Sequence, residues 1–287
     1  CQSGLSTMKH VLFTLLAVLV LIGCEDAPSP QEPATYDPTP WVPDPTTLPF
    51  GYTEVPQPAD YPLTKQRVLL GRMLFYDGKL SSTLSQSCAT CHTQFSAFTD
   101  LRQFSIGVKG LPGHRHAMIL GNLAWHRRGF FWDGRSPTLR DQALRPIQDT
   151  LEMNETLPNV VAKLSADRAY RDQFIRAFGN DSITPERIGI ALEAFMLTLT
   201  TGNSKWDRWK RGQATFTDQE QRGLKLFVTE FDPTGREKGA ECFHCHAEPT
   251  FTNDRYMNNG LDDDATFTDL GRELVTGRPS DRAKFKT

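Results

Sequence analysis

Two copies of the pattern Cys-x-x-Cys-His are the residues of this sequence best suited to chemistry. They are Cys88, Cys91 and His92, followed much later by Cys242, Cys245 and His246. This spacing is typical of c-type haem attachment, in which both thiols form thioethers to the porphyrin and the adjacent imidazole binds the iron. The sequence therefore predicts two covalently bound haem c groups, with His92 and His246 as iron ligands.

Two other chemistries use the same residue types. Four cysteine thiolates could hold a tetrahedral zinc ion, and each pair could instead form a redox-active dithiol. A shared zinc site would not need a histidine beside each pair, nor a separate sequence module around each pair. We therefore favour haem over both alternatives, and interpret His244, inside the second motif, as an exposed spacer.

Each motif lies in a segment that resembles the other, which indicates a duplicated module. Residues 66–100 and 221–254 both contain an apolar helical pattern, a Leu-Phe pair, a glycine-containing loop, the motif, and then Phe-Thr. Further helical patterns cover 136–148, 159–178 and 184–202, and either Ser182 or Thr184 could cap the last of them. Patterns of period two are scarce, so the expected fold class is mainly α.

The bulk composition limits the partners. The chain has 287 residues, enough for two domains, and a formal net charge of −2. Proteins that bind nucleic acid usually present a strongly basic face, so we expect no nucleic-acid partner.

The N-terminal region is expected to be a targeting segment. Within residues 1–24, the apolar run 11–22 is shorter than the roughly 20 residues of a membrane span but suits a signal peptide. The following "LIGC" looks like a lipoprotein cleavage site, so Cys24 would carry a lipid anchor; a signal peptide cut without lipidation is the alternative. Residues 25–62 are rich in proline and predict an extended tether. We expect an exported protein at the periplasmic face of a bacterial membrane.

From about Pro62 onward, the sequence resembles the bacterial di-haem cytochrome c peroxidase family, including its MauG-like branch. The matching segments, in the family's order, are "LGRMLFYDGKLS" (70–81), "SCATCH" (87–92), "FFWDGR" (130–135), "DQALRPIQDTLEM" (141–153), "SKWDRWKRG" (204–212) and "CFHCHAEPTFTN" (242–253). The resemblance implies two cytochrome c-like haem domains in tandem: an N-terminal peroxidatic domain at 63–213 and a C-terminal electron-transfer domain at 214–287. We expect the second to be truncated, because relatives carry a further segment that supplies a distal iron ligand.

The resemblance also assigns roles to single residues. Trp132 matches the tryptophan between the two haems, which implies an electron relay, although most tryptophans simply pack in a core. Glu152 and Gln142 match the distal pocket of the peroxidatic haem, and Pro146 matches a proline on the same face. A carboxyl there can move the proton that O–O bond cleavage requires, whereas the ordinary fate of a glutamate is a solvated surface.

The implied activity is reduction of hydrogen peroxide to water by an oxidoreductase. Electrons would come from a small c-type cytochrome or copper protein and pass from the C-terminal haem through Trp132 to the N-terminal haem. Two alternatives stay open: a MauG-like enzyme that oxidises tryptophan residues of a partner protein, and a non-catalytic di-haem electron carrier.

The sequence leaves open a distal ligand of the first haem and a bound cation. His114 and His116 are candidates for a distal ligand of the first haem, and an open pocket is equally compatible with their spacing. The resemblance also implies an inter-haem calcium ion, but His116 stands at the position of its asparagine ligand, which argues against calcium. The acidic run Asp262–Asp264 could hold a cation or form a solvated loop.

Overall fold

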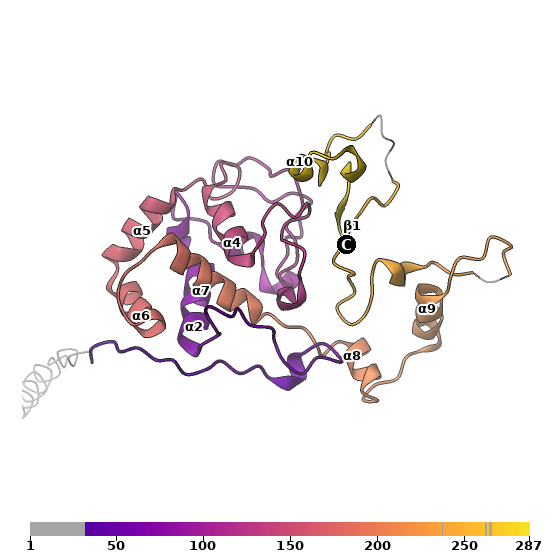
Figure 1. The fold of residues 1–287 in the computed structure, drawn as a ribbon, viewed down its shortest axis with the longest axis horizontal. Helices are drawn as coiled ribbons and strands as arrows, with labels where there is room; N and C mark the ends of the chain where they lie inside the picture. Colours follow the sequence, from indigo (N-terminus) through magenta and orange to yellow (C-terminus); the bar gives the residue numbers. More distant parts are fainter. Residues whose placement is uncertain (1–31, 237, 262, 264–265) are drawn as a thin grey trace, which may run out of the picture. The chain divides into compact units, whose positions relative to one another are not determined.

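A computed structural model describes residues 32–236, 238–261, 263 and 266–287. Ala34–Thr287 form one compact unit. This unit is mainly helical, which confirms the expected fold class (Figure 1). The predicted signal segment and Cys24 lie outside the described residues. Among the helices of the described part, none is long and apolar enough to cross a membrane.

Helix α7 (Pro185–Leu197) organises the first half of the unit. It packs against α2 (Lys65–Tyr76), α4 (Leu139–Gln148) and α5 (Leu157–Ala166), while α6 (Arg168–Phe178) packs against α2 and α5 (Figure 1). All residues of α7 from Ile188 to Leu197 are buried. Gly71 lets α2 approach closely, because a Cβ there would lie 1.8 Å from the carbonyl oxygen of Ala191.

Threonine side chains start the main helices. Thr64 accepts a hydrogen bond from the Arg67 amide at 3.2 Å, and Thr184 accepts one from the Arg187 amide at the same distance. Of the two predicted caps for α7, Thr184 is therefore the correct one. The helical pattern at 159–178 forms two helices rather than one. The break falls at Asp167, which has extended dihedrals and caps α6 through the Ala169 amide at 2.9 Å.

The second half contains fewer helices. They are α8 (Lys205–Lys210), α9 (Asp218–Val228) and α10 (Glu273–Thr276), with two short strands, β1 (Tyr256–Met257) and β2 (Phe285–Lys286). The strands pair antiparallel, with Tyr256 opposite Lys286. The duplicated helices differ in packing, because α2 buries five residues whereas none of α9 is buried.

The loops that connect the longer helices contain short helical turns. They are α3 (Cys88–Cys91) and the 3-10 turns η1 (Pro45–Thr47), η2 (Gly78–Leu80), η3 (Gln94–Ser96), η4 (Leu123–Trp125), η5 (Cys242–His244) and η6 (Pro279–Asp281).

The described part of the proline-rich segment is not the free tether that its composition predicts. Leu48 and Val55 are 1 % and 4 % exposed and belong to the main apolar core. Its backbone is also held, because the Trp41 amide donates to Leu63 and the Lys65 amide to Thr39. Prolines prevent regular helix and sheet, but they do not prevent the apolar residues between them from packing.

The contact between α2 and α7 provides a test of the core. Gly71→Ala should lower the free energy of unfolding by about 2–3 kcal/mol, because the new Cβ overlaps the Ala191 carbonyl and the helices must separate. Chemical denaturation measures the change. Gly223→Ala on α9 is the matched control: a Cβ there meets nothing within 4 Å, so stability should rise by about 0.5–1 kcal/mol. Equal effects of the two substitutions would contradict this packing.

Candidate functional site

The first Cys-x-x-Cys-His motif forms a single helical turn that ends at its histidine. The His92 amide donates to the Cys88 carbonyl at 2.9 Å, which closes the turn. The Nδ1 atom of His92 lies 2.9 Å from the carbonyl oxygen of Phe98. A carbonyl can only accept, so this contact requires hydrogen on Nδ1 and leaves the Nε2 lone pair available to a metal.

The second motif repeats this geometry. The His246 amide donates to Cys242 at 2.8 Å, and Nδ1 of His246 lies 3.1 Å from the carbonyl oxygen of Phe251. Both phenylalanines have left-handed backbones, with φ of +61° at Phe98 and +56° at Phe251. The Phe-Thr that follows each motif in the sequence is therefore the segment that orients each imidazole.

The four motif cysteines are free thiols in this structure. Burial raises the pKa of Cys88 to about 12, and burial also raises the pKa of Cys91. Dithiol exchange needs an accessible thiolate, which this burial disfavours. A thioether carries no charge, so the burial of the first pair is compatible with haem attachment.

One cavity of about 1360 Å³ connects the two motifs. Its walls include both imidazoles, His92 and His246, together with Trp132. Pockets for one small molecule usually measure about 300–1,000 Å³, so this space fits two large macrocycles better than a single ion. Cys88 lines a smaller adjoining cavity of about 60 Å³, while Cys242 and Cys245 are absent from the described walls of both.

Helix α4 and the loop after it place three predicted residues on the cavity wall. Gln142 and Pro146 lie one helical turn apart on the same face, and Glu152 follows the helix. Burial, aided by the charge of Asp149 and opposed by Arg135, raises the pKa of Glu152 to about 7. A carboxyl with this pKa can both accept and return a proton near neutral pH.

Glycine 107 holds the backbone beside Glu152 and was not identified from the sequence. The Val108 amide donates to the Glu152 carbonyl at 2.8 Å, and a Cβ on Gly107 would lie 2.0 Å from the Leu151 carbonyl oxygen. Met153 is 4 % exposed within the core, as expected for a packing residue. The Glu152 side chain is therefore presented from a fixed backbone.

Trp132 stands on a tight turn. Phe130 and Ser136 pair across its base, and Phe131, Gly134 and Gly129 have positive φ. The indole Nε1 donates to the His116 carbonyl at 2.8 Å, and the Trp132 carbonyl accepts from the Lys286 amide at 2.7 Å. The turn is thus hydrogen-bonded to both halves of the unit.

An ion-pair network centred on the buried Asp133 supports this turn. The Asp133 side chain is 5 % exposed and accepts from Arg115 at 2.6 Å, while Arg115 also binds Asp269 with two hydrogen bonds. The bond to Asp269 raises the pKa of Arg115, and Arg115 in turn lowers the pKa of Asp269. Sequence reasoning missed Arg115 and Asp269, because their pairing spans more than 150 residues.

His114 and His116 both line the large cavity, and Nε2 of His116 lies 2.8 Å from the Asp100 carbonyl oxygen. Asp262 and Asp264, candidates for a cation, lie outside the described residues.

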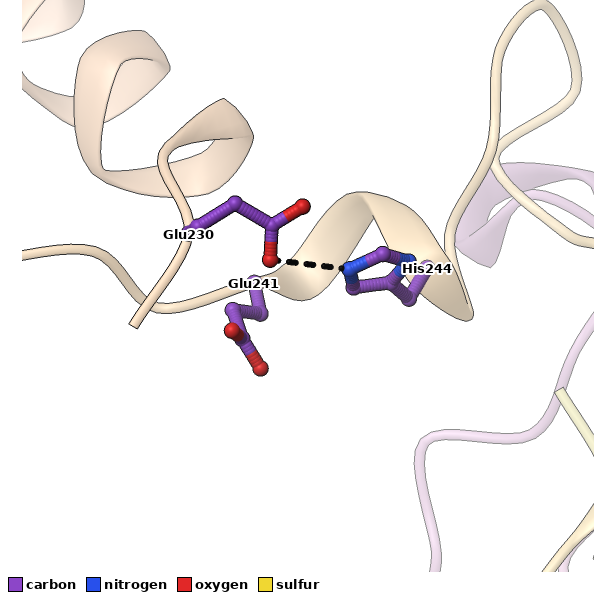
Figure 2. Close-up of side chains that lie close together, drawn as sticks. All are labelled: Glu230, Glu241 and His244. Atoms are coloured by element: carbon purple, nitrogen blue, oxygen red, sulfur yellow. Dashed lines mark hydrogen bonds and ion pairs between the residues drawn. The ribbon is translucent and has the colours of Figure 1, made fainter. Parts of the chain in front are cut away.

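His244 is exposed, as expected for a spacer in the second motif. Its Nε2 pairs with Glu230 at 3.2 Å, close to Glu241 (Figure 2). Glu230, Glu241 and His244 are the one group of three such ligands found in the described part of the chain, and each forms ordinary hydrogen bonds without a metal. Exposed carboxylates commonly cluster in this way, so the group by itself does not indicate a site.

Comparison with known proteins gives consistent matches. Residues 65–215 match the model of the family described as di-haem cytochrome c peroxidase. "Methylamine utilization protein MauG" of Methylophilus methylotrophus is 34 % identical over 219 residues, which cover 76 % of this chain and 62 % of that protein. "Cytochrome c551 peroxidase" of Nitrosomonas europaea is 34 % identical over 220 residues, covering 76 % and 63 %.

A solved structure, described as a MauG-like protein associated with microbial copper homeostasis, superposes with a TM-score of 0.72 at 32 % identity. The match covers 84 % of this chain and 73 % of that one. The chain spans less than two thirds of the length of both named relatives.

The Asp133 network generates a stability prediction. Asp133→Asn should lower the free energy of unfolding by about 1–3 kcal/mol, because the neutral amide removes one of the two carboxylates that bind Arg115 and weakens the buried hydrogen bond between positions 115 and 133. Denaturant titration measures the loss. The control, Asp172→Asn, removes the exposed pair with Arg168 on α6 and should cost less than about 0.5 kcal/mol. A loss at Asp133 as small as the control's would show that the network does not support the fold.

Proposed function

The chain belongs to the di-haem cytochrome c peroxidase family, and from this premise we propose that it reduces hydrogen peroxide to water with electrons from a small redox protein. The observation that carries the proposal is Glu152. Its carboxyl, with a pKa of about 7, lines the same cavity as the first motif's imidazole. A non-catalytic electron carrier would have no use for such a group.

The four cysteines would hold two haem c groups, with His92 and His246 as iron ligands. When bound, haem supplies the iron that binds peroxide and passes on electrons. Glu152 accepts a proton from one peroxide oxygen and returns it to the other, so that the departing oxygen leaves as water. Gln142 offers an amide hydrogen-bond donor beside it, and Pro146 shapes the same wall.

Trp132 is the proposed link between the two haem sites. Its indole lies on the wall that His92 and His246 share, and its ring is fixed by the bond to the His116 carbonyl. Two electrons and two protons convert one peroxide into two waters. The electrons would enter at the C-terminal domain, 214–287, from a c-type cytochrome or copper protein and reach the N-terminal domain, 63–213, through this indole.

We also propose that the protein is exported and anchored in the membrane by lipid at Cys24, on the strength of the sequence alone. Calcium is not part of the proposal, because His116 occupies the expected asparagine position and bonds through Nε2 to the Asp100 carbonyl.

A second candidate function is favoured by the similarity to the MauG of Methylophilus methylotrophus. In that case the oxidising equivalents would modify tryptophan residues of a partner protein instead of being reduced by a donor. Rapid peroxide turnover with a reduced c-type cytochrome would support the peroxidase. A long-lived oxidised state without such turnover would support the second candidate.

Glu152→Gln tests the proton shuttle. The amide cannot accept and return the proton, so peroxide turnover with reduced cytochrome c should fall by roughly 10²-fold or more. Steady-state kinetics at neutral pH measure the loss, and haem absorption checks that both groups are attached. Glu186→Gln, an exposed glutamate in the first turn of α7, should retain the full rate. An unchanged rate in Glu152→Gln would remove Glu152 from the mechanism.

The pKa of Glu152 also predicts a pH profile. Its carboxylate must be free to accept the first proton, so the rate should rise with pH through about 7 as the carboxyl ionises. Turnover measured between about pH 5.5 and 8.5 would show this rise, with haem spectra recorded in parallel to exclude unfolding. Residual turnover in Glu152→Gln should lack it. If the same rise persists in that variant, another group titrates.

A further inference from the structure

Five aromatic side chains form a continuous cluster beside the second Cys-x-x-Cys-His motif. This α8 aromatic cluster consists of Trp206, Trp209, Phe216, Phe227 and Phe251. Trp206 lies at its centre, with its ring 5.2 Å from that of Trp209 and 5.4 Å from that of Phe251. The cluster is closed by Phe216, stacked on Trp209 at 4.7 Å, and by Phe227, 6.0 Å from Phe251.

The cluster is joined to the second imidazole through the backbone of Phe251. His246 Nδ1 lies 3.1 Å from the carbonyl oxygen of Phe251, whose ring contacts Trp206. Phe251 also lines the large cavity, as do Ser204 and Asp207 at the start of α8. From the cavity wall at Phe251, the next ring is that of Trp206, and the one after it is that of Trp209. Trp209 is half-buried.

Packing alone explains the ring contacts but not the choice of indole. The Nε1 atom of Trp206 is buried, and no described residue accepts a hydrogen bond from it. Burying an N–H without an acceptor costs stability that a phenylalanine at the same place would avoid. Phenylalanine is harder to oxidise than tryptophan, so a redox role accounts for this cost.

The charges around the cluster are balanced. Lys210 lies 5.3 Å over the Trp206 ring, and a lone cation there would oppose removal of an electron from the indole. Lys210 is paired with Glu248 at 2.9 Å, however, and Lys205, 6.0 Å over Phe216, is paired with Glu220 at 2.6 Å. Each cation over the rings thus has a carboxylate partner.

We propose that Trp206 and Trp209 relay single electrons from an external redox protein at α8 to the second haem site, at His246. This inference rests on the proposed peroxidase function, which supplies the oxidant. After reaction with peroxide, Trp206 gives one electron to that site and becomes a radical cation, Trp209 refills Trp206, and the reduced donor protein refills Trp209. One electron is transferred, and the Trp206 N–H keeps its proton because it has no acceptor.

The proposed relay acts only in the peroxide-oxidised protein, and this makes it testable. An indole is oxidised only by a strong oxidant, so Trp206 can take part only after peroxide has reacted. Reduction of the resting protein by the donor must bypass both tryptophans. Loss of the relay should therefore slow electron entry into the peroxide-oxidised protein and leave the resting protein unaffected.

Sequential-mixing stopped-flow on the full chain with both haems attached tests this. One equivalent of peroxide is followed by reduced cytochrome c, whose oxidation is recorded. Trp206→Phe and Trp209→Phe should each slow the reaction at least about 10-fold, while Trp41→Phe, outside the cluster, should match the unaltered protein. Reduction of the resting protein should be equally fast in all four.

A second measurement needs no variant. In the unaltered protein treated with peroxide but no donor, peptide mass spectrometry should find oxygen addition at Trp206 and Trp209 well above that at Trp41 and Trp125. Unaltered rates in both variants, or no excess oxidation at these two positions, would overturn the relay and leave the peroxidase function standing. If peroxide leaves the haem spectrum unchanged, both proposals fail.

Discussion

The arrangement of this site depends on a single buried carboxylate. Asp133 follows Trp132 in the turn and binds Arg115, whose guanidinium also holds Asp269. A guanidinium presents its donors in a rigid fork, so Arg115 fixes the relative position of three chain segments at once. The next residue, His116, supplies the carbonyl that receives the Trp132 indole. The orientation of the indole over the cavity therefore follows from where this charge is buried.

The two Cys-x-x-Cys-His modules orient their histidines in the same way but are held in the fold by different contacts. In both, a phenylalanine carbonyl with left-handed backbone orients the histidine through Nδ1. The first module rests on the core of α2 and α7, whereas α9 in the second has no buried residue. The second is held to the turn of Trp132 by polar contacts instead: Asp254 accepts from the Arg127 amide at 2.6 Å, and Lys286, which pairs with Asp254 at 2.7 Å, donates to the Gly129 carbonyl. Hydrogen bonds from His126, Lys286 and this amide outweigh burial and lower the pKa of Asp254, so the carboxylate stays charged.

The sequence predicted what short-range patterns can encode. The helical class, the two Cys-x-x-Cys-His motifs and the cap at Thr184 all depend on residues close together in the chain. The residues expected from the family resemblance, including Glu152, Gln142 and Trp132, do share one cavity. The network of Arg115, the packing of Leu48 and the need for Gly107 all arise from contacts between distant segments. Such contacts leave no periodic signal in a single sequence, and for that reason the composition of the proline-rich segment predicts a tether whereas Leu48 and Val55 pack in the core.

Arg135 links Glu152 to the turn that carries Trp132. Its guanidinium bonds to Asp133 at 3.2 Å, and its charge also lowers the pKa of Glu152 against the larger effect of burial. The pKa of about 7 is thus a balance between a low-polarity wall, which favours the neutral acid, and a cation held in place by the turn. Any change that displaces the turn moves this cation relative to Glu152. The proposed proton transfer at Glu152 and the proposed electron transfer through Trp132 therefore depend on one structural support, the buried Asp133.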